Sequence, residues 1–194
     1  KWQLNRQVNV LSGVNGMGKS TILNKVIKCI PAGGDFTSNT IKGVHLKVYP
    51  ADAKWIRYDV IRSFDRPLIN ADLVAKLGVG LATELDVQLF QLQRKYLDYQ
   101  VDIGNRIIGV LQSGAPDSAQ QAQAISEPKR LFQDMVDRLF ADTGKTIIRT
   151  ENEICFTQIG ETLQPYKLSS GEKQLLVILL TVLVEDKQPY ILFM

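Results

Sequence analysis

The sequence has few of the residues on which several kinds of catalytic and metal site depend. His45 is the only histidine, and the two cysteines, Cys29 and Cys155, lie far apart in the chain. A Ser-His-Asp mechanism or a histidine-rich metal site would have to use His45, and nothing around it suggests either. The cysteine spacing fits no metal or redox motif. We therefore expect two buried free thiols and place His45 on a surface strand.

An excess of one charge and a long apolar run are missing too. Lys plus Arg is 23 and Asp plus Glu is 20, a formal net charge of +3, so no overall basic field requires nucleic acid as a partner. The longest apolar stretch is Leu175–Val184, which Thr181 interrupts, and it is far shorter than the roughly 20 residues that span a bilayer. The polar start, Lys1 to Ser12, carries no secretory signal. These features predict a cytoplasmic protein without a membrane partner.

Length and composition are those of an ordinary globular domain. The chain has 194 residues, of which 45% are hydrophobic and 22% charged, with 14 Gly and 7 Pro. These values exclude a collagen, a coiled-coil rod and wholesale disorder. The length suffices for one domain with a real core, or for one domain with a small additional lobe.

The spacing of apolar residues predicts an α/β fold, with a mixed sheet core, antiparallel strands and a helical insertion. Strands are expected at Val8–Leu11, Val44–Tyr49, Ile56–Phe64, Thr146–Ile148, Ile154–Ile159 and from Tyr190 onward. Helices are expected at Ser20–Ile30, from about Asp72 to Gln112, from Ser126 to Gly144 and across Leu175–Val184.

Local signals add detail to this order of elements. The strands at Val44–Tyr49 and Ile56–Phe64 are close in sequence and are expected to form an antiparallel pair. Residues Ser113–Ala124 contain almost no bulky apolar side chain and are predicted to be a loop or linker. Ser126 is then expected to cap a helix with Pro128 in its first turn.

A glycine-rich segment carries the strongest chemical signal. Residues Gly13–Ser20 read GVNGMGKS and fit the pattern G-x-x-x-x-G-K-[ST]. The glycines let backbone N–H groups turn toward an anion, and the helix that follows adds its positive end. Lys19 is expected to reach the β- and γ-phosphates, and Ser20 to place its hydroxyl on Mg²⁺. The predicted ATP-binding residues are Asn15, Gly16, Met17, Gly18, Lys19, Ser20 and Thr21.

A second segment, Leu168–Gln174, reads LSSGEKQ. Taken alone it is a polar turn that caps an apolar helix, with Ser169 or Ser170 as the N-cap. Together with the glycine-rich segment it resembles the signature motif, L-S-G-G-Q, of the ABC-type ATPases. Ser170 replaces the first glycine of that motif and Glu172 replaces the glutamine. The LSSGEKQ form resembles the RecF, SMC and OLD-type ATPases more than the membrane transporters.

The resemblance implies a P-loop NTPase fold and an ABC-type ATPase head that dimerises on ATP. In that family two heads meet head to tail, and each signature motif closes on the γ-phosphate of the ATP bound by its partner. The resemblance therefore assigns a role in trans to Ser169, Ser170, Gly171 and Glu172. It implies ATP and Mg²⁺ as cofactors and an ATP-dependent homodimer. It also points to DNA repair, DNA maintenance or anti-phage defence, with DNA and a nuclease domain or subunit as partners.

The final apolar segment, Pro189–Met194, corresponds in this family to the strand that leads into the Walker B carboxylates. The resemblance places an Asp that helps to hold Mg²⁺ and a Glu that polarises the attacking water just after Met194. We therefore expect one ATPase domain that is incomplete at its C-terminus. Its parts would be 1–70 as the core with the glycine-rich loop, 71–144 as the helical insertion, and 145–194 as the signature and Walker B segment. Asp65 is a candidate for the family's Mg²⁺-contacting loop, or simply a turn residue.

Three other functions stay open at this point. A nucleotide-dependent binding module would lack hydrolysis, and the residues after Met194 distinguish it from an enzyme. The ATP subunit of a membrane transporter would carry a glutamine loop, for which no clear match is present. A small-molecule P-loop kinase would not need Leu168–Gln174. Within the resembling group, an SMC protein would need long coiled-coil arms, and the sequence shows no sustained heptads.

Overall fold

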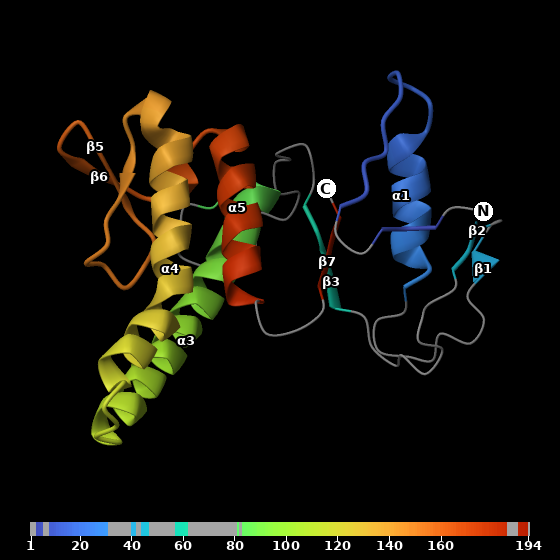
Figure 1. Cartoon of the computed structure of the whole chain (residues 1–194). Helices are drawn as coiled ribbons and strands as arrows, with labels where there is room; N and C mark the ends of the chain where they lie inside the picture. The colour runs from blue at the N-terminus through green and yellow to red at the C-terminus, as the bar shows by residue number, and fades with distance from the viewer. Residues whose placement is uncertain are drawn as a thin grey trace. The chain divides into compact units, whose positions relative to one another are not determined.

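The chain combines α-helices and β-strands, as the sequence predicts at the level of fold class. A computed structural model describes residues 3–5, 8–30, 40–41, 44–46, 57–61, 81, 83–185 and 190–193. They fall into two compact units, each described by itself (Figure 1): Lys1–Asp59 with Pro189–Phe193, and Val60–Gln188 with Met194. Asp65 and Met194, which the sequence singles out, lie outside the described residues. Within the described part, no helix is both long and apolar enough to cross a membrane.

In the first unit, helix α1 spans Lys19–Lys28 and confirms the helix predicted at Ser20–Ile30. The predicted strand before it, Val8–Leu11, is wrong, because these residues form no regular structure and Val8 and Val10 are 75% and 81% exposed. The side chain of Asn9 binds the backbone of Asn5 instead, accepting from its N–H at 2.7 Å and donating to its carbonyl at 2.8 Å. Such local hydrogen bonds compete with strand pairing.

The strands of the first unit pair differently from the prediction. β1 (Thr40–Ile41) pairs antiparallel with β2 (Val44–His45), so His45 does lie on a strand. β3 (Arg57–Val60) pairs with β7 (Tyr190–Phe193) from the far end of the chain. The expected pairing of Val44–Tyr49 with Ile56–Phe64 is therefore wrong for the described residues. Tyr58 and Phe193 meet edge to face across the β3–β7 pair, with ring centroids 6.1 Å apart.

Three helices form the body of the second unit (Figure 1). They are α3 (Glu84–Gln112), α4 (Ser118–Phe140) and α5 (Ser170–Val184), and α3 packs against both of the others. Gly104 and Gly109 do not interrupt α3, which is one helix of 29 residues. The shared core is built from buried apolar side chains of all three helices: Leu85, Leu89, Leu92, Tyr96, Phe132, Val136, Phe140, Leu176, Val177, Leu180 and Leu183.

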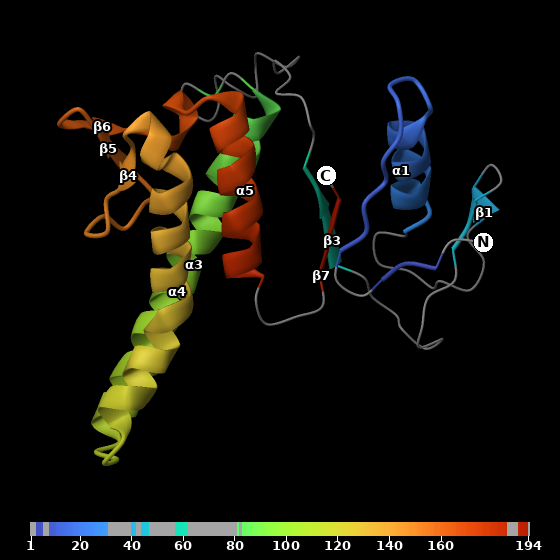
Figure 2. The same ribbon diagram turned by 45° about the horizontal axis from the view of Figure 1, so that its top comes forward.

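Two ion pairs show that α3 and α5 run in the same direction. Near the start of both helices the Lys173 ammonium lies 2.8 Å from a carboxylate oxygen of Asp86, and both side chains are buried. Further along, the Lys95 ammonium lies 2.6 Å from a carboxylate oxygen of Glu185 just past the end of α5. The α3–α4 hairpin continues past the end of α5 and projects away from the small sheet (Figures 1 and 2).

Helix α4 overturns the prediction of a loop at Ser113–Ala124. Only the start of that segment is a turn, because α4 begins at Ser118. Ser126, the predicted cap, lies inside the helix and donates its hydroxyl to the Gln123 carbonyl at 2.9 Å. Alanine and glutamine favour a helix even where few bulky apolar residues are present, and packing against α3 stabilises the element.

The small sheet of the second unit has the order β4-β5-β6 and is antiparallel throughout. β4 (Thr146–Ile147) and β5 (Phe156–Gln158) confirm two predicted strands, with shorter bounds. The third strand, β6 (Glu161–Leu163), was not predicted. The sheet is attached to α4 through Phe156 and Phe140, whose ring centroids are 5.5 Å apart. Cys29 and Cys155 are buried free thiols, as expected.

The turn between β5 and β6 contains a strained residue. Ile159 has φ of 50° and is 97% exposed, and Gly160 follows with φ of 79°. A β-branched side chain at positive φ is unfavourable by roughly 1 to 2 kcal/mol, whereas asparagine before glycine is preferred in such hairpin turns. We expect Ile159→Asn to raise the free energy of unfolding by about 1 kcal/mol, because no packing is lost. Urea denaturation measures this change, and Gly160→Ala should lower the same quantity. A destabilised Ile159→Asn variant would contradict this account of the turn.

Candidate functional site

The glycine-rich segment folds into an exposed loop that leads directly into α1. Gly16 and Gly18 have φ of 87° and 79°, a region that favours glycine. A side chain at either position would be strained, although the space beside Gly16 is open. The pattern of glycines therefore matches the backbone that the loop adopts. Asn15 precedes Gly16 and Met17 lies between the two glycines, and both residues are exposed.

The side chain of Lys19 folds back over this loop. Its ammonium donates hydrogen bonds to the carbonyl oxygens of Gly13 at 2.8 Å and of Val14 at 3.0 Å. Residues at the two ends of the loop are therefore joined by one cation. The ammonium group lies where it can exchange these carbonyl oxygens for those of a bound anion.

The start of α1 leaves backbone donors at the end of the loop. Gly18 is the N-cap and supplies no side-chain hydrogen bond, and the first turn contains no acidic residue. The first N–H groups of a helix have no partner within the helix, and they carry its positive end. The hydroxyl-bearing residues Ser20 and Thr21 are exposed at this first turn. Together these groups form a surface suited to phosphate.

Ser20 also bears on the predicted Mg²⁺ site. Its hydroxyl offers one oxygen ligand, which suits an ion that takes its other ligands from phosphate oxygens and water. Among the described residues, no group of three or more His, Cys, Asp and Glu could hold a metal ion by itself. A Mg²⁺ at this loop would thus depend on the nucleotide for most of its ligands.

The second motif lies in the second unit, at the start of α5. Ser169 is the N-cap, and Glu172 completes a capping box with it. The Glu172 carboxylate accepts from the Ser169 N–H and from the Ser169 hydroxyl, both at 2.9 Å. The Glu172 N–H donates in turn to the Ser169 hydroxyl oxygen at 3.4 Å. The N-cap predicted at Ser169 or Ser170 is therefore confirmed at Ser169.

The other carboxylate oxygen of Glu172 binds outside the motif. It accepts from the Thr143 hydroxyl and from the Lys145 ammonium, each at 2.8 Å. Burial by itself would raise the pKa of Glu172, but the hydrogen bonds from Lys145, Ser169 and Thr143 outweigh it and lower the pKa to about 2. The carboxylate is therefore ionised at neutral pH and holds the turn before β4 against the start of α5.

Lys173 links the signature segment to a second capping box, which lies at the start of α3. Its ammonium pairs with Asp86, whose other carboxylate oxygen accepts from the Thr83 N–H at 3.0 Å at the start of α3. The Asp86 N–H donates to the Thr83 hydroxyl at 3.3 Å. The spacing of Thr83 and Asp86 could have signalled this cap, but the sequence gives no sign that Lys173 lies beside it.

The outward part of the signature segment consists of Ser169, Ser170 and Gly171, all of which are exposed. Glu172 differs, because the residue is 8% exposed and both carboxylate oxygens accept hydrogen bonds within the chain. The roles in trans that the resemblance assigns to these four residues stay predictions. The geometry favours contact through the first three and a supporting position for Glu172.

No family model, curated protein or solved structure matches the chain. The case for its activity therefore depends on the two motifs and on the geometry described above.

Proposed function

We propose that the chain is the ATP-binding head of an ABC-type P-loop ATPase, from the group that the RecF, SMC and OLD-type proteins represent. In the intact protein it hydrolyses ATP, with Mg²⁺ as cofactor, and two heads dimerise on the nucleotide. Its role in DNA repair, DNA maintenance or anti-phage defence, beside a nuclease, rests on the resemblance of the motifs alone. Its place in the cytoplasm rests on the sequence features given above.

The observation that carries the proposal is the position of Lys19. Lys19 stands at the start of a helix, and two carbonyl oxygens of the preceding glycine-rich loop hold its ammonium against that loop. Phosphate oxygens are stronger acceptors for an ammonium than neutral carbonyl oxygens. When ATP binds, the Lys19 ammonium would leave the carbonyl oxygens of Gly13 and Val14 and bind the β- and γ-phosphates. The N–H groups at the start of α1 would donate further hydrogen bonds to the phosphates.

The chemistry expected at the loop is positioning and charge neutralisation. Phosphoryl transfer to water gathers charge on the γ-phosphate oxygens, and fixed donors stabilise it. Lys19 and the N–H groups at the start of α1 would serve this role. Mg²⁺, held in part by the Ser20 hydroxyl, supplies further neutralisation when bound.

The second site would act across the dimer. At the start of α5 the exposed Ser169 hydroxyl and the Gly171 N–H lie at the positive end of a helix of 15 residues, which suits a γ-phosphate. Glu172, with Lys145 and Thr143, fixes the shape of this turn. ATP bound between two heads would therefore stabilise the dimer, and its hydrolysis would release it.

The experiment that tests the proposal is ATP-driven dimerisation of the Gly171→Asp variant. Nothing lies within 4 Å of a Cβ built at Gly171, and its φ is not in the region that excludes side chains, so aspartate fits. An acidic residue in the first turn also suits the helix dipole, so folding should not suffer. We expect wild-type chains to dimerise with Mg²⁺ and ATP in sedimentation velocity. The variant should stay monomeric because its carboxylate repels the phosphate.

Gly171→Ala is the matched control, since it adds a Cβ without charge and should still dimerise. Calorimetric titration should still show ATP binding to Gly171→Asp, because its glycine-rich loop is unchanged, with the affinity lowered only by the part that dimerisation contributes in the wild type. The proposal fails if saturating ATP leaves the wild-type chain monomeric. The role of the signature segment fails if Gly171→Asp dimerises as the wild type does.

A further inference from the structure

The signature segment carries a negative charge that the motif it resembles lacks. The motif L-S-G-G-Q has a neutral glutamine where this chain has Glu172. One carboxylate oxygen of Glu172 lies 2.9 Å from both the N–H nitrogen and the hydroxyl oxygen of Ser169, which is exposed and proposed to contact a γ-phosphate. A carboxylate and a phosphate that approach the same donors repel each other. The segment therefore needs a compensating charge to accept an anion.

The ammonium group of Lys145 supplies this charge. It lies 2.8 Å from the other carboxylate oxygen of Glu172, the one that does not bind Ser169. The side chains of Lys145 and Glu172 are only 11% and 10% exposed, so water and salt screen the pair weakly. The two formal charges cancel at close range, and the positive end of α5 is then the charge that an approaching anion meets.

A turn after α4 places Lys145 beside the signature segment. The short helix η2 (Ala141–Thr143) follows α4 and ends at Gly144, whose φ of 65° suits glycine. Across this turn the Lys145 N–H donates to the Phe140 carbonyl at 3.4 Å. The backbone of Lys145 is therefore held by a bond to the end of α4, and its side chain is available to the start of α5.

The other cation in the first turn of α5 has a different partner. Lys173 directly follows Glu172, but its ammonium pairs with Asp86 at 2.8 Å, and both of these side chains are buried at the start of α3. Within the described ranges, the cation that forms an ion pair with Glu172 is therefore Lys145.

We propose that Glu172 and Lys145 act together as the neutral equivalent of the glutamine in the L-S-G-G-Q motif, and that the charge of Lys145 allows the signature segment to accept the γ-phosphate of a partner head. Lys145 is a positioning residue, because it acts through Glu172 and does not touch the nucleotide. Since it concerns the ATP-dependent dimer, this role rests on the proposed function. Without Lys145, the Glu172 carboxylate would oppose the phosphate at the donors of Ser169.

The test is the dimerisation constant of the full chain at saturating Mg²⁺ and ATP, measured by sedimentation equilibrium. Lys145→Gln leaves the Glu172 carboxylate without its cation and should weaken dimerisation about tenfold or more. Glu172→Gln removes the negative charge, so it should dimerise at least as strongly as the wild type. The double variant restores a neutral pair and should return the constant to near the wild-type value, since a capping box accepts glutamine in place of glutamate.

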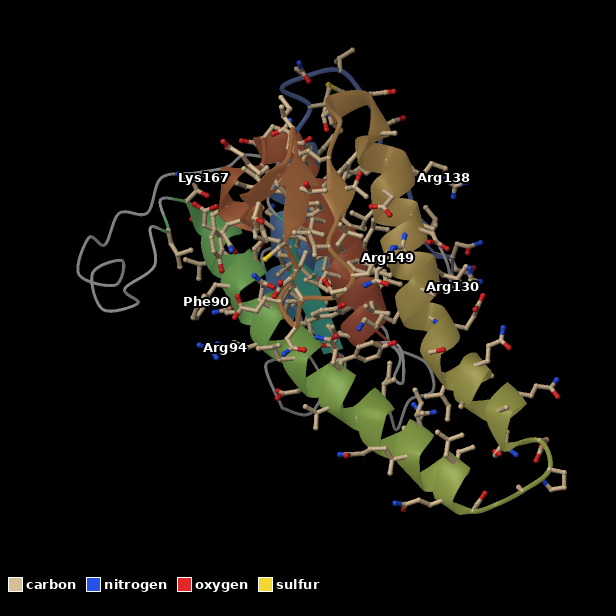
Figure 3. The ribbon with its side chains drawn as sticks, turned by 90° about the vertical axis from the view of Figure 1, so that its left-hand side faces the viewer. Phe90, Arg94, Arg130, Arg138, Arg149 and Lys167 are labelled. Atoms are coloured by element: carbon tan, nitrogen blue, oxygen red, sulfur yellow. The ribbon has the colours of Figure 1, made fainter. Side chains whose placement is uncertain are left out.

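A purely structural role of the pair predicts a different pattern, in which both single variants weaken dimerisation because each breaks the same contact. Arg138→Gln is the matched control, since it removes an equal charge from an exposed position, and Figure 3 shows the Arg138 side chain on the outer side of α4. This variant should keep the wild-type constant. Thermal unfolding of each variant checks the fold, and if Glu172→Gln does not fold, the comparison of Lys145→Gln with the double variant decides.

The possible outcomes separate this role from the proposed function. The role of Lys145 is overturned, and the proposed function is not, if the wild type dimerises and Lys145→Gln dimerises equally well. The same holds if the double variant is no better than Lys145→Gln, or if Arg138→Gln is as weak. A wild type that stays monomeric at saturating ATP contradicts the proposed function itself, and the role of Lys145 fails with it.

Discussion

Replacing Lys19 with alanine is expected to abolish measurable ATP binding, with a loss of affinity of at least about 100-fold. The ammonium group is the only cation within hydrogen-bond distance of the loop carbonyls among the described residues. Its removal leaves the β- and γ-phosphates with neutral N–H donors alone, while the charge of the nucleotide is unchanged. Calorimetric titration of the full chain with Mg²⁺ and ATP measures the effect.

Lys28→Ala is the matched control, because Lys28 lies in the last turn of the same helix and is exposed. This variant loses an equal charge from α1 and should keep the wild-type affinity. Since Lys19 also joins Gly13 and Val14, thermal unfolding of each variant should be recorded beside the titration. A folded Lys19→Ala variant with unchanged affinity would refute the assignment of the glycine-rich loop as the ATP site.

The second large effect is expected at Glu172. The pKa of this group is about 2 in the folded chain and 4.5 without the fold. A lowered pKa means that its ionised contacts stabilise the fold above about pH 4.5, and that this contribution is lost as the pH falls toward 2. The difference corresponds to about 3 kcal/mol. We expect Glu172→Gln to lower the free energy of unfolding by about this amount at pH 7, and by much less near pH 2.5.

Urea denaturation at several pH values measures the loss. Glu172→Gln leaves the Lys145 ammonium in a place that is 11% exposed, without its carboxylate, so the double variant Glu172→Gln with Lys145→Met should recover part of the stability. Asp102→Asn is the control, because Asp102 and Arg106 form an exposed pair at 3.8 Å that should contribute little. A loss at Glu172→Gln that is the same at pH 7 and pH 2.5 would contradict the electrostatic origin.

Features set by neighbouring residues could be predicted from the sequence. α1 follows from apolar residues spaced by four and from the motif before it, and the cap at Ser169 follows from a serine three residues before Glu172. The strands at β4 and β5 follow from short β-branched and aromatic runs. In each of these cases the side chains that decide the structure lie within one or two turns of each other.

Features that depend on residues far apart in the chain could not be predicted from the sequence. β3 pairs with β7, which the chain reaches only after the whole second unit. The partners of Glu172 and Lys173, Lys145 and Asp86, carry no sequence mark that links them to the motif. The start of α4 at Ser118 could not be predicted either, because the helix is stabilised as a whole by its packing against α3, and its buried residues, Phe132, Gln133, Val136 and Phe140, lie further along it.

The parallel attachment of α5 to α3 has a mechanical consequence. Because the ion pairs at Asp86 and Lys95 fasten both ends of α5 to α3, the two helices would turn as one rigid body. With 29 residues, α3 is about 43 Å long, so a rotation of about 5° at the end that holds Lys173 would sweep the far end of the hairpin through about 4 Å. The hairpin would therefore act as a lever arm. A small rotation at the signature segment would become a larger displacement at the far end of the hairpin.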